Sequence, residues 1–123
     1  MPETASDLTI TLQDDRPGTL AAALEAVARA EINVEGMVEL GGVVHLLTHD
    51  PAGTTRALRA ARVRVGYERS VLVVALQDRP GAGAAVLRRL ADAGHNIEYC
   101  YLATNTRLVI AGGDPRLLAQ ALE

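Results

Sequence analysis

The sequence contains no lysine, no phenylalanine and no tryptophan, and its only aromatic residues are three tyrosines. Nucleic-acid binding needs clustered cations and, for single strands, aromatic side chains on which bases can stack. The formal net charge is −3 and the arginines form no basic stripe, so a nucleic-acid partner is not expected. Without large aromatic residues, the core has to be built from Val, Leu, Ile and Ala.

Cysteine and long apolar runs are scarce as well. Cys100 is the only cysteine, so the chain forms neither an intramolecular disulfide nor a cysteine-rich zinc site. The three histidines lack the spacing of a ligand set, so we predict no metal and no cofactor. No stretch approaches the roughly 18 consecutive apolar residues of a membrane span, and the N-terminus lacks the pattern of a secretory leader. These absences predict a cytoplasmic protein.

The most informative feature that is present is an internal repeat. The tetrapeptide Asp-Arg-Pro-Gly occurs at Asp15–Gly18 and again at Asp78–Gly81. Each copy follows a β-like run and opens an Ala/Leu-rich helical pattern. Each pattern ends at an Asn followed by a β-branched residue, 18 positions after the Asp, at Asn33 and at Asn96. Because the register is kept across a whole helix, the chain is a duplication with a period of about 63 residues.

Hydrophobic periodicity gives the elements of each copy. In the first copy we predict strand 8–13, a helix to about residue 30, a strand from about residue 33, a Gly-Gly hairpin, strand 43–48, helix 54–61 and strand 63–66. In the second copy we predict strand 71–77, helix 81–93, strand 96–103, strand 107–111 and helix 115–122. The order is that of the ferredoxin-like βαββαβ unit. The predicted fold is therefore α+β, with two tandem ferredoxin-like units at 7–66 and 70–123, the second lacking its last strand, behind a polar tail of residues 1–6.

A strand, a loop with Asp-x-Pro-Gly, a helix and an Asn-hydrophobic pair together resemble the ACT domain, a small βαββαβ regulatory module. The segments LQDDRPGTL, INVEG and LQDRPGAGAAVLRRLADAGHNIEYCY carry this resemblance, which spans about residues 7–122. The chain is similar to free-standing tandem ACT proteins of bacteria. The resemblance implies a non-catalytic, allosteric regulatory protein that binds a small amino acid between two ACT units. It also implies a homodimer and a partner enzyme of amino-acid metabolism.

The resemblance further implies which residues hold the ligand. In the first copy these are Asp15, Arg16, Gly18, Thr19, Leu20, Asn33 and Val34, and in the second copy Asp78, Arg79, Gly81, Ala82, Asn96 and Ile97. The residue types suit that role, because a helix N-terminus offers unpaired N–H groups and a positive dipole end to a carboxylate. A glycine allows close approach to the backbone, and an asparagine offers both a donor and an acceptor.

Simpler interpretations remain open for each motif. The Asp-x-Pro-Gly loops could serve only as turns and helix caps, and Asn33 and Asn96 could end helices in the left-handed conformation. Tyr99 and Tyr101 share a strand face, which is typical of core residues and also of pocket linings. No combination of nucleophile, base and oxyanion donor is readable, so we do not expect catalysis. The alternative function is a ligand-free interaction or dimerisation module that regulates a partner enzyme.

Overall fold

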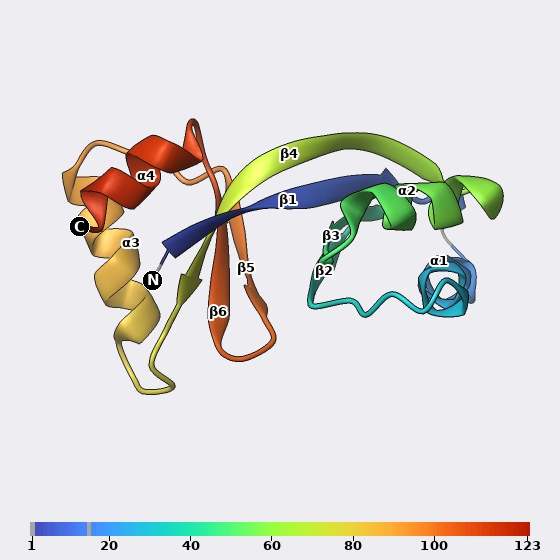
Figure 1. The fold of residues 1–123 in the computed structure, drawn as a ribbon, viewed down its shortest axis with the longest axis horizontal. Coiled ribbons are helices and arrows are strands. Elements are labelled where there is room, and N and C mark those ends of the chain that lie inside the picture. Colours follow the sequence, from blue (N-terminus) through green and yellow to red (C-terminus); the bar gives the residue numbers. More distant parts are fainter. Residues whose placement is uncertain (1, 15) are drawn as a thin grey trace. The chain divides into compact units, whose positions relative to one another are not determined.

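The computed structural model describes residues 2–14 and 16–123, which form an α+β fold with six strands and four helices (Figure 1). No helix among these residues is both long enough and apolar enough to span a membrane. The elements follow the order β1 (Pro2–Thr11), α1 (Thr19–Arg29), β2 (Gly36–Leu40), β3 (Val43–Leu47), α2 (Pro51–Ala60), β4 (Arg64–Ala75), α3 (Ala82–Asp92), β5 (Tyr99–Ala103), β6 (Arg107–Ala111) and α4 (Pro115–Ala121).

The chain divides into two compact units. The first is residues 6–69, and the second is residues 70–123 together with the N-terminal residues through Ala5. Strands β1 and β4 are each continuous across this division, so both contribute to both units. The prediction of a polar tail is therefore wrong, because residues 2–5 form part of strand β1. They belong to the second unit, which was predicted to lack its last strand. Residues 2–4 are exposed and offer no apolar alternation to read.

The sheet of the first unit is antiparallel, with β3 between β1 and β2. Gly41 and Gly42, with φ of 58° and 87°, form the predicted two-residue hairpin between β2 and β3. The first half of β4 runs beside β1, since a Cβ added at Gly66 would lie 3.3 Å from the carbonyl oxygen of Thr9. The strand order in this unit is therefore β4-β1-β3-β2.

The core of the first unit lies between this sheet and the two helices. Helix α1 presents one buried stripe because its core residues are four positions apart. Helices α1 and α2 also contact each other. The buried cluster consists of Ile10, Val44 and Leu46 from the sheet, Ala23 and Val27 from α1, and Leu58 from α2.

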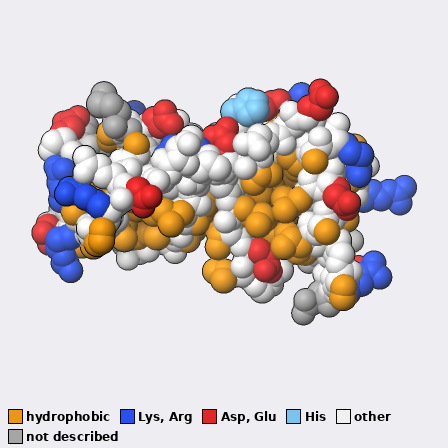
Figure 2. Space-filling model, turned by 90° about the horizontal axis from the view of Figure 1, so that it is seen from below, with side chains coloured by type: hydrophobic (Ala, Val, Ile, Leu, Met, Phe, Trp, Pro, Cys, Tyr) orange, Lys and Arg blue, Asp and Glu red, His pale blue; other side chains and the backbone are white. Residues whose placement is uncertain are grey.

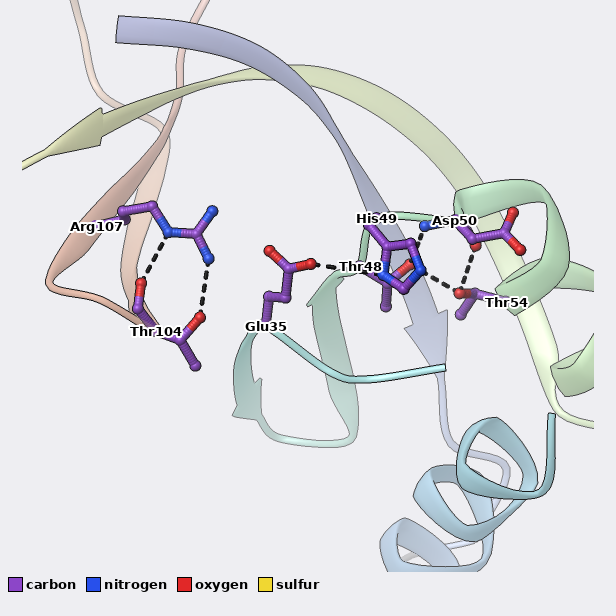
Figure 3. Close-up of polar contacts among 7 residues, drawn as sticks. All are labelled: Glu35, Thr48, His49, Asp50, Thr54, Thr104 and Arg107. Carbon is purple, nitrogen blue, oxygen red and sulfur yellow. Dashed lines mark hydrogen bonds and ion pairs between the residues drawn. The ribbon is translucent and has the colours of Figure 1, made fainter. Parts of the chain in front are cut away.

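The sheet of the second unit is also antiparallel, with β6 between β4 and β5. Its hairpin is one residue longer and contains Asn105 and Thr106 in left-handed conformation, with φ of 61° and 52°. The guanidinium of Arg107 closes this turn by donating to the carbonyl (2.8 Å) and the hydroxyl (2.9 Å) of Thr104 (Figure 3). Because of this extra residue, equivalent positions of the two copies lie one residue further apart after the hairpin than before it.

The core of the second unit is made of aliphatic residues, as expected. Val71 and Val73 on one face of β4, and Leu72 on the other, are at most 1% exposed. This part of β4 is therefore covered on both faces. The buried cluster on the helix side consists of Leu72, Val74, Leu90, Leu108, Ile110 and Leu118.

Candidate functional site

The first Asp-Arg-Pro-Gly loop folds into a tight turn that leads directly into α1. The carbonyl oxygen of Arg16 accepts from the N–H of Thr19 at 3.4 Å. Between them stand Pro17 and Gly18, and Gly18 has φ 94° and ψ −15°. Proline at the second position and a positive-φ glycine at the third are the signature of a type II turn. Gly18 is needed here, because other residues adopt this φ only with strain.

The second loop forms the same turn ahead of α3. The carbonyl oxygen of Arg79 accepts from the N–H of Ala82 at 3.3 Å, and Gly81 has φ 87° and ψ −7°. Gly81 is the N-cap residue of α3, and no side chain caps this helix. Asp78 therefore does not act as a cap in the second copy. Its counterpart Asp15 lies outside the described residues.

The N-terminus of α1 presents open backbone amides. The first intrahelical hydrogen bond runs from the N–H of Ala22 to the carbonyl of Gly18 at 2.9 Å. The amides of Leu20 and Ala21 therefore have no acceptor within the helix. A Cβ added at Gly18 would meet nothing within 4 Å, so the space beside this glycine is open. Such a helix start can accept a carboxylate through N–H donors and the positive dipole end.

A cavity of about 440 Å³ opens at this turn, within the first unit. Its size falls in the range of small-molecule sites, about 300–1,000 Å³. One wall is the turn with the start of α1, and the other is the segment that ends α2 and begins β4. The lining consists of residues 11–14, 16–19, 22 and 61–64.

Three of the four charged side chains among the described residues around this cavity are arginines. Arg16 makes an ion pair with Asp14 (3.2 Å), but both side chains are more than half exposed, so the pair adds little stability. Among the described residues, the guanidiniums of Arg62 and Arg64 have no hydrogen bond or ion pair. With three arginines and one aspartate, the described lining has a formal charge of +2, whereas the chain carries −3.

A second cavity of about 510 Å³ lies on the other side of the same loop. It shares residues 12–14, 16 and 19 with the first cavity and adds Leu20 and the β2–β3 hairpin. The hairpin is held to the loop, since the Leu12 N–H donates to the Gly42 carbonyl at 2.8 Å. The carboxylate of Glu39 accepts from the Gly42 N–H, also at 2.8 Å. The first loop thus has an opening on both sides.

Arg62 is a site residue that sequence reasoning missed. It has φ 64° and follows the end of α2, where its N–H donates to the Arg59 carbonyl (3.0 Å). The N–H of Val63 donates to the Leu58 carbonyl (2.9 Å), which completes a Schellman motif with arginine in the place usually taken by glycine. The sequence signal for this motif is a polar residue at the end of the helix, Arg62, followed directly by an apolar residue, Val63. Glu31, with φ 59°, ends α1 in the same way.

The predicted residues of the first copy separate into two groups. Asn33 and Val34 line neither cavity among the described residues, and β2 begins only at Gly36. Val34 packs against the core instead. Because Glu31 takes the left-handed position, the alternative role of Asn33 as a helix end is wrong. The cavities do bring together four predicted residues, Arg16, Gly18, Thr19 and Leu20.

In the second copy, Gly94 (φ 86°) ends α3, so Asn96 does not serve as that helix end. The carbonyl oxygen of Asn96 lies directly against the position that a Cβ on Gly112 would occupy. Ile97 packs against the second core. The remaining predicted residues are exposed or half-buried in the loop and at the start of α3, and they are Asp78, Arg79, Gly81 and Ala82.

The tyrosine pair lies on one face of β5, as predicted. The rings of Tyr99 and Tyr101 are parallel within 3°, with centroids 6.5 Å apart, and Tyr101 is only 6% exposed. A stacked, largely buried pair favours a packing role for these residues. Among the described residues, no three His, Cys, Asp or Glu side chains are grouped as a metal site would require.

No family model matches the sequence, and no curated protein is similar to it. Solved structures are similar over almost the whole chain. Protein BT0572 from Bacteroides thetaiotaomicron is 27% identical, with a TM-score of 0.79 and coverage of 98% of this chain and 88% of that one. The ligand-free regulatory subunit of aspartate kinase from Thermus thermophilus is 20% identical, with a TM-score of 0.64 and coverage of 99% and 97%.

A third similar structure is E. coli aspartokinase III in complex with lysine and aspartate. It is 20% identical, with a TM-score of 0.61, and the match covers 98% of this chain but 31% of the enzyme. The chain shares its fold with aspartate kinase regulatory subunits. The α+β fold expected from the sequence is confirmed at this level.

Proposed function

We propose that this chain is a non-catalytic regulatory protein of the ACT type, built of two tandem ferredoxin-like repeats, which binds a small amino acid at its first Asp-Arg-Pro-Gly loop. One observation carries the proposal. The open type II turn at Gly18, which leads into the N-terminus of α1, lines a cavity of about 440 Å³. A helix N-terminus of this kind suits a carboxylate, because its first N–H groups are unpaired.

The comparisons support a regulatory role and an amino-acid ligand. One similar structure is a regulatory subunit in its ligand-free form, and another is an aspartokinase with bound lysine and aspartate. By analogy, the partner of this chain would be an enzyme of amino-acid metabolism, and the chain would act as a cytoplasmic homodimer. A ligand shifts such a regulator only if it binds the two states with different affinity.

Isothermal titration of the chain with each of the twenty amino acids tests the proposal, and we expect heat from at least one of them. The matched variants are Gly18→Ala and Gly81→Ala. Both glycines have φ near 90° and open space around the missing Cβ, so each variant should lose a similar 1–2 kcal/mol or so of stability. Only Gly18→Ala should also weaken ligand binding, because its methyl group stands at the cavity. Equal affinity in both variants would move the site away from the first loop.

The absence of heat from all twenty amino acids would favour the ligand-free interaction module instead. That alternative has its own observation. Leu40 at the β2–β3 hairpin is 75% exposed and Leu102 on β5 is 64% exposed. Hydrophobic side chains also reach the surface on the part of the molecule that carries α1 and α2, at the right of Figure 2. In that case, Leu40→Ser should weaken self-association measured by light scattering.

A further inference from the structure

The described residues that line the cavity at the first loop carry an excess of positive charge. Cations stand on both of its walls, from Arg16 on the loop and from Arg62 and Arg64 on the segment after α2. The single described carboxylate, Asp14, is already paired with Arg16. Two guanidiniums on the second wall therefore remain without a partner among the described residues. A neutral amino acid would leave them facing only solvent.

We propose that the ligand is an acidic amino acid of the glutamate or aspartate class, an inference that rests on the proposed function. One carboxylate lies at the start of α1, where Gly18 and Thr19 line the cavity. The second carboxylate lies at Arg62 and Arg64, whose guanidiniums can each donate a pair of charge-assisted hydrogen bonds. A ligand with a carboxylate at each end uses both walls, whereas a monocarboxylate uses only one. A side chain with its own positive charge, such as that of lysine, would meet the arginines and be disfavoured.

Titration calorimetry with L-glutamate, L-aspartate, L-glutamine, L-asparagine and L-lysine tests this inference. Each acid and its amide have nearly the same shape, so their difference reports the side-chain charge alone. We expect each acid to bind roughly tenfold more tightly than its amide, as charge-assisted hydrogen bonds are about twice as strong as neutral ones. L-Lysine should bind most weakly.

The variant Arg62→Gln should lower glutamate affinity about tenfold and leave glutamine affinity unchanged. Arg59→Gln is the matched control, because Arg59 is exposed near the same helix end but does not line the cavity. Glutamine or lysine binding as tightly as glutamate would overturn this inference while leaving the proposed function intact. If none of the five ligands, nor any other amino acid, gives heat, the proposed function fails and this inference fails with it.

Discussion

The two repeats share the same turns and helix starts, but the side chains around these features differ. Both copies enter their first helix through an Arg-Pro-Gly type II turn, and both begin their second helix with Asp-Pro. The side chains after the turn differ, since the first helix opens with Thr19 and Leu20 and its counterpart with Ala82 and Gly83. A shared turn therefore fixes where a helix begins, while the neighbouring side chains decide whether the turn can hold a ligand.

A second difference follows from the hairpins. Because the β5–β6 loop is one residue longer than the β2–β3 loop, Gly112 is the counterpart of Thr48. Thr48 is buried and its hydroxyl donates to Thr54 at 2.8 Å, and Thr54 in turn donates to the Asp50 carbonyl at 2.7 Å (Figure 3). Gly112 instead makes room for the backbone of Asn96. The same position thus holds a hydrogen-bonded threonine in the first copy and a glycine packed closely against backbone in the second.

The largest predicted effect comes from adding a side chain at Gly112, where the backbone of Asn96 packs closely. Gly112→Ala would place a methyl group directly against the Asn96 carbonyl oxygen, and backbone cannot give way as a flexible side chain does. We expect a loss of about 3 kcal/mol in the free energy of unfolding, measured by urea denaturation. Gly83→Ala is the control, because its added Cβ would meet only Leu76 at 3.8 Å inside α3. That variant should gain roughly 0.5–1 kcal/mol. Similar changes in the free energy of unfolding of Gly112→Ala and Gly83→Ala would show that the Asn96 carbonyl does not lie against Gly112.

The second prediction compares the two Asp-Pro helix caps. Asp50 accepts from the Gly53 N–H at 2.9 Å within the partly buried Thr48–Thr54 network. Asp50→Ala should cost about 1–2 kcal/mol of unfolding free energy. Asp114→Ala should cost less, since Asp114 is bound by the neighbouring Arg116 at the surface. Equal losses on urea denaturation would mean that the buried threonines add nothing to the first cap.

The Asp114 cap should also depend on pH. The side-chain hydrogen bond from Arg116 lowers the pKa of Asp114 below its ordinary value of 3.8. A lowered folded-state pKa gives stability that is present above the unfolded value and is lost as the pH falls through the folded value. The difference between wild type and Asp114→Ala should therefore persist at neutral pH and disappear in acid well below 3.8. A difference that grows in acid would contradict this assignment.

The smallest effect concerns the helix ends in left-handed conformation. Glu31→Gly and Arg62→Gly each relieve a positive φ on a non-glycine residue, so each should stabilise the chain by up to about 1 kcal/mol. Their stabilities should change alike because both residues hold the same Schellman position. Only Arg62→Gly should weaken amino-acid binding in calorimetry. Loss of binding in Glu31→Gly as well would indicate an indirect effect through the fold.

Much of the fold could be predicted from the sequence, because the same motifs occur twice with the same spacing. The turn at Gly18 and Gly81, the Gly41-Gly42 hairpin and the aliphatic cores follow from local residue types. The continuity of β4 from Arg64 to Ala75 could not be read, since Tyr67 and Glu68 are exposed and interrupt the apolar pattern. The strand at residues 2–5 was hidden for the same reason.

The candidate site was readable only in part. The loop residues were visible as a motif, but the opposite wall at 61–64 depends on where the end of α2 packs, which is a tertiary property. Nothing in the local pattern distinguishes the two loops except the residues that follow them. The role of Asp15, Asn33 and Asn96 in ligand binding stays a prediction.

The most direct test of the account is an NMR titration of the isotope-labelled chain with the amino acid that gives the largest heat. The account predicts amide shift changes that saturate together at Leu20, Ala21 and the segment 61–64, with Gly83 and Ala84 little affected. Changes centred on Gly83 and Ala84, with Leu20 and Ala21 unmoved, would contradict it.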